Sequence, residues 1–438
     1  MKLQAPRGTR DFYPAQMAWR NHLLDTWRKV SIRHGFEQVD GPIFESLDLY
    51  RVKSGEGIVS ELFHFEDRGG RELAIRPEFT PTLARMVAER ANSLSKPIKW
   101  FCTPNFCRAE RPQRGRLREF WQWNVDILGS ESAIADAECL LVAIDFMQEL
   151  GLTREHVRVK LSHRDVVRQI LLRLGVPDDK MLEAFDLLDR RGKIQEEEFT
   201  AGAIRLGLDE PRIERFEQMC RRKYPAGDIA HLQRSVGLNG SLDCLDELDR
   251  HLRAFGITEW CEYDLGIVRG LAYYTGTVFE LHEATGVERA LAGGGRYDQL
   301  IELFGGPSMS AVGFGMGDVV LTNVLKDKAL LPEDVLPKPD VFCVSATDEV
   351  SERLPDLVRI LRRNGLHVRF SYKTSRNLGK LLKEASGSGA AFTVILDKNL
   401  ISNGQVSVKD MTSGEQRELS ITGLADALAV MVDQVTQG

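Results

Sequence analysis

Residues 106–126, FCRAERPQRGRLREFWQWNVD, constrain the fold most, because two runs with strand character meet there at a short loop crowded with arginine. The arginines around the single Gly115 are Arg108, Arg111, Arg114, Arg116 and Arg118. Guanidinium groups match the geometry of phosphate oxygens, and clustered positive charge attracts anions. The segment therefore predicts two strands whose connecting loop binds a polyanion: nucleotide phosphates, a nucleic-acid backbone, or both.

The second of these runs predicts a strand with two unlike faces. Successive strand residues point to opposite sides of a sheet. One face then carries Arg118, Phe120, Gln122, Asn124 and Asp126, and the other carries Leu117, Glu119, Trp121, Trp123, Val125 and Ile127. The second face is mostly apolar and is expected in a core. The first is too polar to be buried unless it holds a ligand, and the alternative is an edge hairpin with a solvated polar face.

Length and charge bound what the rest of the chain can be. With 438 residues the chain is too long for one core, so two or three domains are expected. A net charge of −6 argues against binding nucleic acid through overall charge, although local basic faces remain possible. Three further basic clusters, at Arg190, Arg221 and Arg362, are more typical of solvated helix ends.

Neither a membrane segment nor a metal centre is indicated. No apolar run approaches the roughly 20 residues of a membrane helix, and the opening MKLQAPRGTRDFYP has no signal-peptide core, so a cytoplasmic location is expected. The seven cysteines include no C-x-x-C pair, and the nine histidines show no metal-ligand spacing. Neither a disulfide framework nor a zinc site is predicted.

The order of the predicted elements indicates an α+β fold with an antiparallel sheet flanked by helices. In chain order they are a helix at 15–34, a strand at 36–44, a hairpin and then a helix within 60–90, strands at 98–108 and 117–128, a helix at 133–150, a helical insertion at about 163–255, strands at 262–282 and 288–293, and a glycine-rich strand-to-helix passage at 312–325. The three prolines of 326–339 predict a linker after a first domain that spans 1–325. Residues 340–438 then predict a separate α/β domain with a hairpin at Ser413-Gly414.

Other polar clusters are candidates for a site. Glu78 precedes a predicted helix and could hold an ammonium group, although alone it is more typical of a helix-start carboxylate. In VRGLAYYTG, Arg269 could clamp a phosphate or carboxylate beside two tyrosines; a turn with surface tyrosines is the alternative. Glycine clusters at 293–295 and 313–317 allow close approach of a ligand, but neither has P-loop spacing. No Ser-His-Asp order appears, which favours chemistry by positioning and charge neutralisation.

Taken together, these motifs resemble the histidyl-tRNA synthetases, which are class II aminoacyl-tRNA synthetases. PRGTRDFYP resembles the family's opening, GFEQVDGPIFE its motif 1, FCRAERPQRGRLREFWQ its motif 2 and GFGMGDVVL its motif 3. The most specific matches are VRGLAYYTG and AGGGRYDQL, which resemble two peptides peculiar to the histidine enzymes. The resemblance covers nearly the whole chain, and SNGQVSVKDMTSGEQ lies where the family has a hairpin of its C-terminal anticodon-binding domain.

The resemblance implies a fold and a reaction. The fold is a class II antiparallel sheet flanked by helices, with a helical insertion and a C-terminal α/β anticodon-binding domain, and motif 1 implies a homodimer. The reaction has two steps: L-histidine attacks ATP to form histidyl-adenylate, and the terminal hydroxyl of tRNA(His) then takes the histidyl group. Mg²⁺ is expected to bridge the ATP phosphates.

The resemblance also implies roles for single residues. Arg108 and Arg269 are the expected catalytic residues. The expected histidine-binding residues are Glu78, Phe79, Thr80, Arg108, Gln122, Asp126, Arg269, Tyr273 and Tyr274. Among them Glu78, Thr80 and Gln122 surround the α-ammonium group, and Asp126 and the tyrosines face the imidazole. ATP is expected at Arg108, Glu110, Phe120 and Arg269, and the tRNA acceptor end at Arg111 and Gln113.

Three positions depart from the family pattern. Val320 stands where motif 3 usually has an arginine for the γ-phosphate, and Arg296 could take its place; Ala272 replaces an acid, and Asp397-Lys398 replaces Gly-Glu. Val320 is the best argument for an alternative, a non-catalytic relative that acts as regulatory subunit of ATP phosphoribosyltransferase. That paralogue lacks the C-terminal domain and tends to lose the motif 2 arginines, and both are present here. A tRNA-binding module without catalysis is the third possibility.

Overall fold

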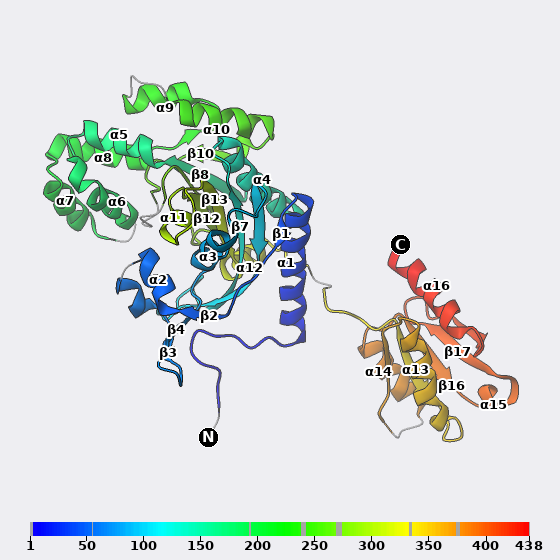
Figure 1. Cartoon of the computed structure of the whole chain (residues 1–438). Coiled ribbons are helices and arrows are strands. Elements are labelled where there is room, and N and C mark those ends of the chain that lie inside the picture. Colours follow the sequence, from blue (N-terminus) through cyan, green and yellow to red (C-terminus); the bar gives the residue numbers. More distant parts are fainter. Residues whose placement is uncertain are drawn as a thin grey trace. The chain divides into compact units, whose positions relative to one another are not determined.

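The computed structural model describes residues 3–54, 56–191, 194–237, 242–268, 274–332, 335–373 and 377–437. The chain divides into two compact units, Met1–Glu333 and Asp334–Gly438 (Figure 1). No helix in the described ranges is long and apolar enough to cross a membrane.

A ten-stranded sheet forms the centre of the larger unit, in the order β1-β5-β7-β13-β12-β11-β8-β10-β9, with β6 also paired to β7. Its strands are β1 (Glu37–Gln38), β5 (Ile98–Cys102), β6 (Asn105–Cys107), β7 (Glu119–Leu128), β8 (Val157–His163), β9 (Tyr224–Pro225), β10 (Cys261–Tyr263), β11 (Thr277–Glu283), β12 (Ala292–Arg296) and β13 (Ala311–Gly317). The run from β5 to β8 is antiparallel, as predicted. The sheet as a whole is mixed, because β1 pairs with β5 and β10 with β8 in parallel.

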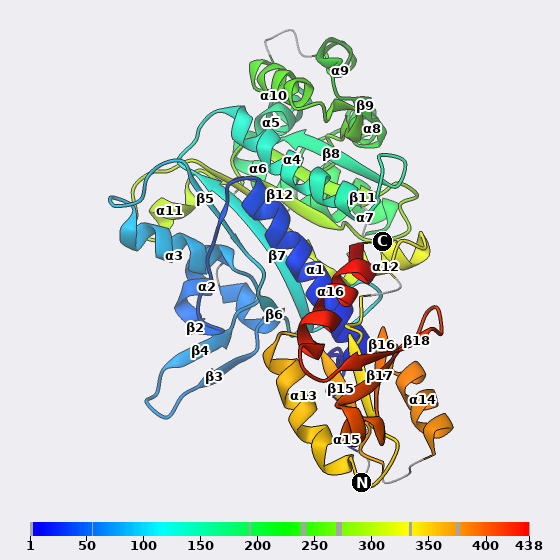
Figure 2. The same cartoon turned by 90° about the vertical axis from the view of Figure 1, so that its right-hand side faces the viewer.

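The apolar face of β7 is covered by helices, which confirms the alternation predicted for this strand. Trp123, Val125 and Ile127 are buried in one core with residues of α1 (Pro14–Arg33), α4 (Ala133–Glu149) and α12 (Asp318–Asp327). The Trp123 and Trp27 rings are stacked with their centroids 6.1 Å apart. Figure 2 shows α1 lying along β7. This packing fixes the strand, so that its opposite face is held in one orientation.

Helices follow β8, as the pattern of 163–255 predicted. They are α5 (Arg164–Arg173), α6 (Met181–Arg190), α7 (Glu196–Arg205), α8 (Glu210–Arg221), α9 (Ile229–Val236) and α10 (Asp243–Ala254), with the short 3-10 helices η2 (Asp178–Lys180) and η4 (Thr258–Trp260). Figure 1 shows them gathered at the end of the sheet that holds β8 and β10. Strand β8 itself was not predicted.

Several boundaries differ from the prediction. The strand expected at 98–108 is two strands, β5 and β6, separated at Pro104, which lacks the N–H that a continuous ladder needs. The single strand expected at 262–282 is wrong, because β10 ends at Tyr263 and β11 begins at Thr277. Near the N-terminus, α2 (Leu47–Ser54) and η1 (Glu56–Glu61) were missed. A small sheet of β2 (Phe44–Ser46), β4 (Glu72–Ile75) and β3 (His64–Glu66) leads to α3 (Thr80–Arg90), and α11 (Leu300–Leu303) lies between β12 and β13.

The smaller unit has its own five-stranded sheet in the order β15-β14-β16-β17-β18. Its elements are β14 (Val341–Ser345), η5 (Ser351–Arg353), α13 (Leu354–Arg363), β15 (Val368–Phe370), α14 (Leu378–Gly387), β16 (Phe392–Leu396), α15 (Asn399–Asn403), β17 (Gln405–Asp410), β18 (Gln416–Ser420) and α16 (Leu424–Gln437). The predicted hairpin at Ser413-Gly414 joins β17 to β18. Helix α15, which follows Asp397-Lys398, was not predicted.

Candidate functional site

The polar face of β7 forms a wall of a cavity of about 160 Å³ in the larger unit. The lining residues are Glu78, Thr80, Arg108, Gln122, Asn124, Asp126, Tyr274, Gly293, Tyr297, Gly313, Phe314 and Gly315. The structure thus brings together Glu78, Thr80, Arg108, Gln122, Asp126 and Tyr274, which were predicted from separate parts of the chain. The edge-hairpin alternative for this face is wrong, because Asn124 and Asp126 are buried.

Glycine makes the space for this cavity. In the β7–β13 ladder, Gly313 lies opposite Asp126 and Gly315 opposite Asn124. A Cβ atom on Gly315 would lie 2.8 Å from Cδ of Gln122, and one on Gly313 would overlap the Asp126 carboxylate. Any larger residue at these two positions would push the polar side chains of β7 out of place. Here the glycines make room for side chains of the site; the close approach of a ligand expected from the sequence stays a prediction.

Among the residues that the structure describes, none forms an ion pair with the carboxyl group of Asp126. Its side chain accepts a hydrogen bond from the hydroxyl of Tyr297, and the residue is only 7% exposed. Burial raises the pKa of Asp126 to about 7, with the Tyr297 hydrogen bond acting in the opposite direction. Near neutral pH this carboxyl can therefore accept or donate a proton. Tyr297 was not among the predicted site residues, although it directly follows β12, whose glycine cluster the sequence singled out.

Glu78 is held by a residue that sequence reasoning missed. The Nζ atom of Lys53 lies 2.5 Å from Oε2 of Glu78, and the Lys53 side chain is 1% exposed. Lys53 belongs to α2, a helix that was not predicted, so no signal in the sequence linked it to Glu78. Thr80, the first residue of α3, also lines the cavity, but Phe79 does not: its ring is buried in a hydrophobic cluster with Leu83.

Arg108 lies between the cavity and the aromatic side chains of β6 and β7. Its Nε donates to the carbonyl oxygen of Pro77 at 3.1 Å, and its guanidinium carbon is 5.0 Å from the centroid of the Phe120 ring. Phe120 in turn contacts Phe106, with ring centroids 5.9 Å apart. Arg108, which lines the cavity, and Phe120, which was also predicted to bind ATP, are therefore neighbours.

The tip of the arginine loop forms a second, separate hollow. Glu110, Arg111, Gln113 and Arg116 line it together with Glu61 and Pro112, and its volume is about 610 Å³. Glu110 forms an ion pair with Arg116. Glu110, predicted to meet adenine, and Arg111 and Gln113, predicted to meet the tRNA acceptor end, lie together in this hollow and do not line the smaller cavity that holds Asp126. Phe120, the other residue predicted to meet adenine, does not line the hollow.

The structure argues against Arg296 as the substitute for the arginine that is absent at Val320, a possibility that the sequence left open. Its guanidinium is buried against Asp136, with Nε 3.2 Å from both carboxylate oxygens, and it also donates to the carbonyl oxygens of Ser130 (2.8 Å) and Ser132 (3.1 Å). All of these partners are protein groups, so the Arg296 guanidinium is used to hold the fold together and not to bind a phosphate. Arg269 and Tyr273, together with Ala272, lie outside the described residues.

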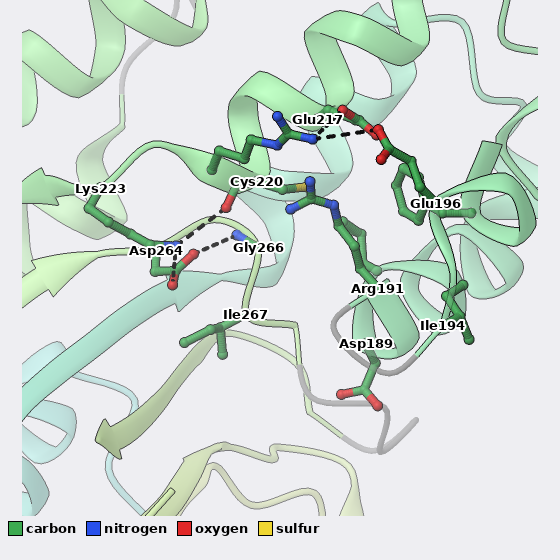
Figure 3. Close-up of a pocket in the computed structure, with 13 residues that line it drawn as sticks. Asp189, Arg191, Ile194, Glu196, Glu217, Cys220, Lys223, Asp264, Gly266 and Ile267 are labelled. Carbon is green, nitrogen blue, oxygen red and sulfur yellow. Dashed lines mark hydrogen bonds and ion pairs between the residues drawn. The ribbon is translucent and has the colours of Figure 1, made fainter. Parts of the chain in front are cut away.

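Another polar cavity, of about 470 Å³, lies between α6, α7, α8 and the segment after β10 (Figure 3). Several of its charged side chains are paired with one another. Lys223 forms an ion pair with Asp264, and a guanidinium nitrogen of Arg221 lies 2.9 Å from Glu217 and 3.9 Å from Glu196. The basic cluster at Arg221 is thus neutralised locally, in agreement with its interpretation as a helix end and not a binding patch.

No group of three or more His, Cys, Asp or Glu side chains within the described ranges could hold a metal ion. We therefore assign no protein ligand to Mg²⁺. The side chains around the cavity at Asp126 instead offer hydrogen-bond acceptors, one guanidinium and an aromatic wall, which suit a small polar molecule with both an ammonium group and an anionic group.

Comparisons with known proteins agree with this site and with both units. Residues 8–318 match the family described as Histidyl-tRNA synthetase, and residues 340–431 match the family Anticodon binding domain. The chain is 38% identical over 420 residues to the chloroplastic/mitochondrial histidine–tRNA ligase of Arabidopsis thaliana, covering 96% of this chain and 85% of that protein. It is 39% identical over 416 residues to the histidine–tRNA ligase of Haloarcula marismortui, covering 94% of each. The crystal structure of histidyl-tRNA synthetase from Nostoc sp. PCC 7120 matches with a TM-score of 0.79 and 24% identity over 98% of this chain and 100% of that one, which shows the shared fold.

Proposed function

Because this chain belongs to the histidyl-tRNA synthetase family, we propose that it is a histidine–tRNA ligase whose amino acid site is the cavity at Asp126. The observation that carries the assignment of the site is the gathering of Glu78, Arg108 and Asp126 around one cavity. The two acids could bind the ammonium group and the imidazole of one and the same ligand. The arginine could bind an anionic group of that ligand.

The residues would act mainly by positioning and by neutralising charge. Asp126 would accept a hydrogen bond from an imidazole N–H of histidine, and Glu78 would face its α-ammonium group. A carboxylate oxygen of histidine would attack the α-phosphorus of ATP, and the bond from that phosphorus to the leaving pyrophosphate would break. Arg108 would stabilise the negative charge on the phosphate. In the second step the terminal hydroxyl of tRNA(His) would attack the carbonyl carbon, and AMP would leave.

ATP is expected as a substrate because synthetase activity requires it, and Mg²⁺ would be bound to the phosphates of ATP.

We also expect a homodimer. The rings of Phe44 on β2 and Phe65 on β3 are 53% and 44% exposed, with centroids 6.2 Å apart, close to the segment that resembles motif 1. Neighbouring exposed apolar rings can form part of a contact surface with a partner. Sedimentation of the protein should give the mass of a dimer, and Phe65→Asp should shift it to a monomer; a monomeric wild type would contradict the proposal. A cytoplasmic location also remains our expectation.

The regulatory-subunit alternative has less support. That paralogue lacks an anticodon-binding domain, whereas residues 340–431 match one here. The arginines of the motif 2 loop are also retained.

The test is the exchange of labelled pyrophosphate into ATP, with and without L-histidine, followed by charging of tRNA(His). We expect exchange that depends on histidine and is absent with other amino acids. A folded protein that binds histidine but never exchanges pyrophosphate would support the regulatory alternative instead. Binding of tRNA without exchange would indicate the third possibility, a tRNA-binding module.

A further inference from the structure

Because Val320 has no charged group, the negative charge of the terminal phosphates of ATP would need another cation at this position. This residue is buried in the core cluster near the start of α12, and its side chain has no polar atom that could bind a phosphate. Arg296, the cation suggested by the sequence, is committed to Asp136. If the enzyme binds ATP, another group must offset the negative charge of the terminal phosphates on this side of the site.

Arg289 lies beside Val320. Both side chains lie within 4 Å of the place where a Cβ atom of Gly115 would be, with Cγ2 of Val320 at 3.2 Å and Cδ of Arg289 at 3.6 Å. Gly115 is the turn of the arginine loop and has a φ of +72°, which favours glycine. The loop between β11 and β12, which carries Arg289, therefore meets the arginine loop and α12 at one point.

This meeting of three segments is fixed by ion pairs. The Glu288 side chain is buried, and its Oε1 accepts a hydrogen bond from Nε of Arg114 at 2.6 Å. A guanidinium nitrogen of Arg114 also lies 3.2 Å from the carboxylate of Asp327 on α12. The residue that precedes Arg289 is thus tied to the arginine loop, and the loop is tied to α12.

The guanidinium of Arg289 is left available. Arg289 is exposed and has no hydrogen bond or ion pair with any residue that the structure describes. The charge of Arg289 nevertheless acts on the arginine loop. The pKa of Arg116 is lowered, mainly by burial and next by the positive charges of Arg289 and Arg108. Like charges held this close repel one another, and a bound polyphosphate would relieve that repulsion.

We propose that Arg289 binds the terminal phosphates of ATP in place of the arginine that Val320 has replaced. The inference rests on the proposed function and goes beyond it, because it assigns a specific phosphate contact to a loop outside the three class II motifs. Arg289 is a binding residue for the nucleotide only. It should have no part in recognising histidine, whose pocket lies at Asp126.

The test compares variants in the pyrophosphate exchange assay at varied ATP and varied histidine. For Arg289→Ala we expect the KM for ATP to rise by about tenfold to hundredfold, the usual size of a lost charged hydrogen bond, with the KM for histidine within about twofold. Arg289→Lys should recover part of the loss. The double variant Arg289→Ala with Val320→Arg should recover more, because it returns a guanidinium to the neighbouring position. Arg250→Ala removes an exposed arginine of α10 and serves as the matched control, with no change expected.

Two outcomes would overturn the proposal while leaving the function intact. One is an active wild type in which Arg289→Ala leaves the KM for ATP unchanged. The other is a variant with normal exchange but slow transfer to tRNA, which would make Arg289 a contact for the nucleic acid. Absence of exchange in the wild type would instead contradict the proposed function itself.

Discussion

Two polar cavities in the larger unit differ in how their charges are balanced. In the cavity drawn in Figure 3, Lys223 pairs with Asp264 and Arg221 with Glu217, so these acids and bases on its wall neutralise each other. In the cavity at β7, the carboxyl of Asp126 has only the neutral hydroxyl of Tyr297 as its hydrogen-bond partner in the described part of the chain. Both cavities are rich in polar atoms, but among the described residues the buried carboxyl of Asp264 is paired with a lysine and that of Asp126 is not paired with any cation.

This difference in charge balance indicates which cavity should bind a ligand. A buried carboxyl without a cation is costly to keep ionised, and such a cost persists in a fold mainly where a ligand offsets it. For self-paired charges, mutual attraction offsets part of this cost. The cavity in Figure 3 is nearly three times as large, at about 470 Å³ against about 160 Å³. Cavity volume is therefore a poorer indicator of ligand binding here than unpaired charge.

The largest effect is expected from Asp126→Asn. The amide keeps the size of the side chain but removes the charge that would bind the imidazole N–H, and loss of such a contact from a buried polar site costs on the order of a hundredfold or more in kcat/KM for histidine. Exchange kinetics measure the loss, and circular dichroism checks the fold. A loss below threefold would mean that Asp126 does not contact the amino acid.

A smaller but clear effect is expected from Gly315→Ala. The added methyl group would lie 2.8 Å from Cδ of Gln122 and displace it from the wall of the cavity. We expect the KM for histidine to rise at least tenfold, on the order of one lost hydrogen bond to a charged group. Gly317→Ala on the same strand is the matched control, because a Cβ atom there has no neighbour within 4 Å. Equal effects of the two substitutions would show that β13 tolerates no side chain for reasons unrelated to the site.

The pH dependence of histidine binding also tests whether the carboxyl of Asp126 binds the amino acid. The pKa of Asp126 is raised to about 7, so the carboxyl is mostly protonated at pH 6 and mostly ionised at pH 8. If the ionised form accepts the imidazole N–H, affinity should rise with pH through about 7, by up to about tenfold between these values. Equilibrium dialysis with labelled histidine measures it. In Asp126→Asn only the titration of histidine itself should remain, and an unchanged profile in that variant would contradict the assignment.

The same raised pKa has a consequence for stability with the opposite sign. Between pH values of about 4, where an unfolded aspartate releases its proton, and about 7, the folded protein holds a proton that the unfolded chain has lost. The contribution of Asp126 to the free energy of unfolding therefore falls as pH rises across this range. Histidine affinity and unliganded stability should thus move in opposite directions with pH.

Much of this site follows from the period of one strand. Because side chains alternate along β7, the sequence alone placed Gln122, Asn124 and Asp126 on one face and three core residues on the other. What it could not reveal are contacts between segments far apart in the chain. Lys53 reaches Glu78 from an unpredicted helix. Arg296 and Asp136, which are 160 positions apart, pair only because of the order of the strands.

The same limit explains some of the errors in the fold. Local patterns predicted the helices of 163–255 and the hairpin of the smaller unit, since both depend on neighbouring residues. Strand β8 was missed although Val157, Val159 and Leu161 alternate with polar residues, because the strand leads directly into the helical pattern that begins at 163. The parallel pairing of β1 with β5 and of β10 with β8 depends on crossovers that no local pattern records.

The smallest effect on activity is expected from Asp264→Asn in the cavity of Figure 3. Asp264 is buried and is paired with Lys223, and its Oδ1 accepts a hydrogen bond from the backbone N–H of Gly266 at 3.1 Å. Breaking a partly exposed ion pair should lower the free energy of unfolding by about 1 kcal/mol or more, because the lysine loses its partner. Exchange kinetics should nevertheless stay within about twofold of the wild type, since these charges serve the fold. Thermal unfolding and exchange, measured on the same preparation, separate the two effects. A variant that unfolds normally but exchanges poorly would show that self-paired charges also take part in function, and the distinction between the two cavities would then be lost.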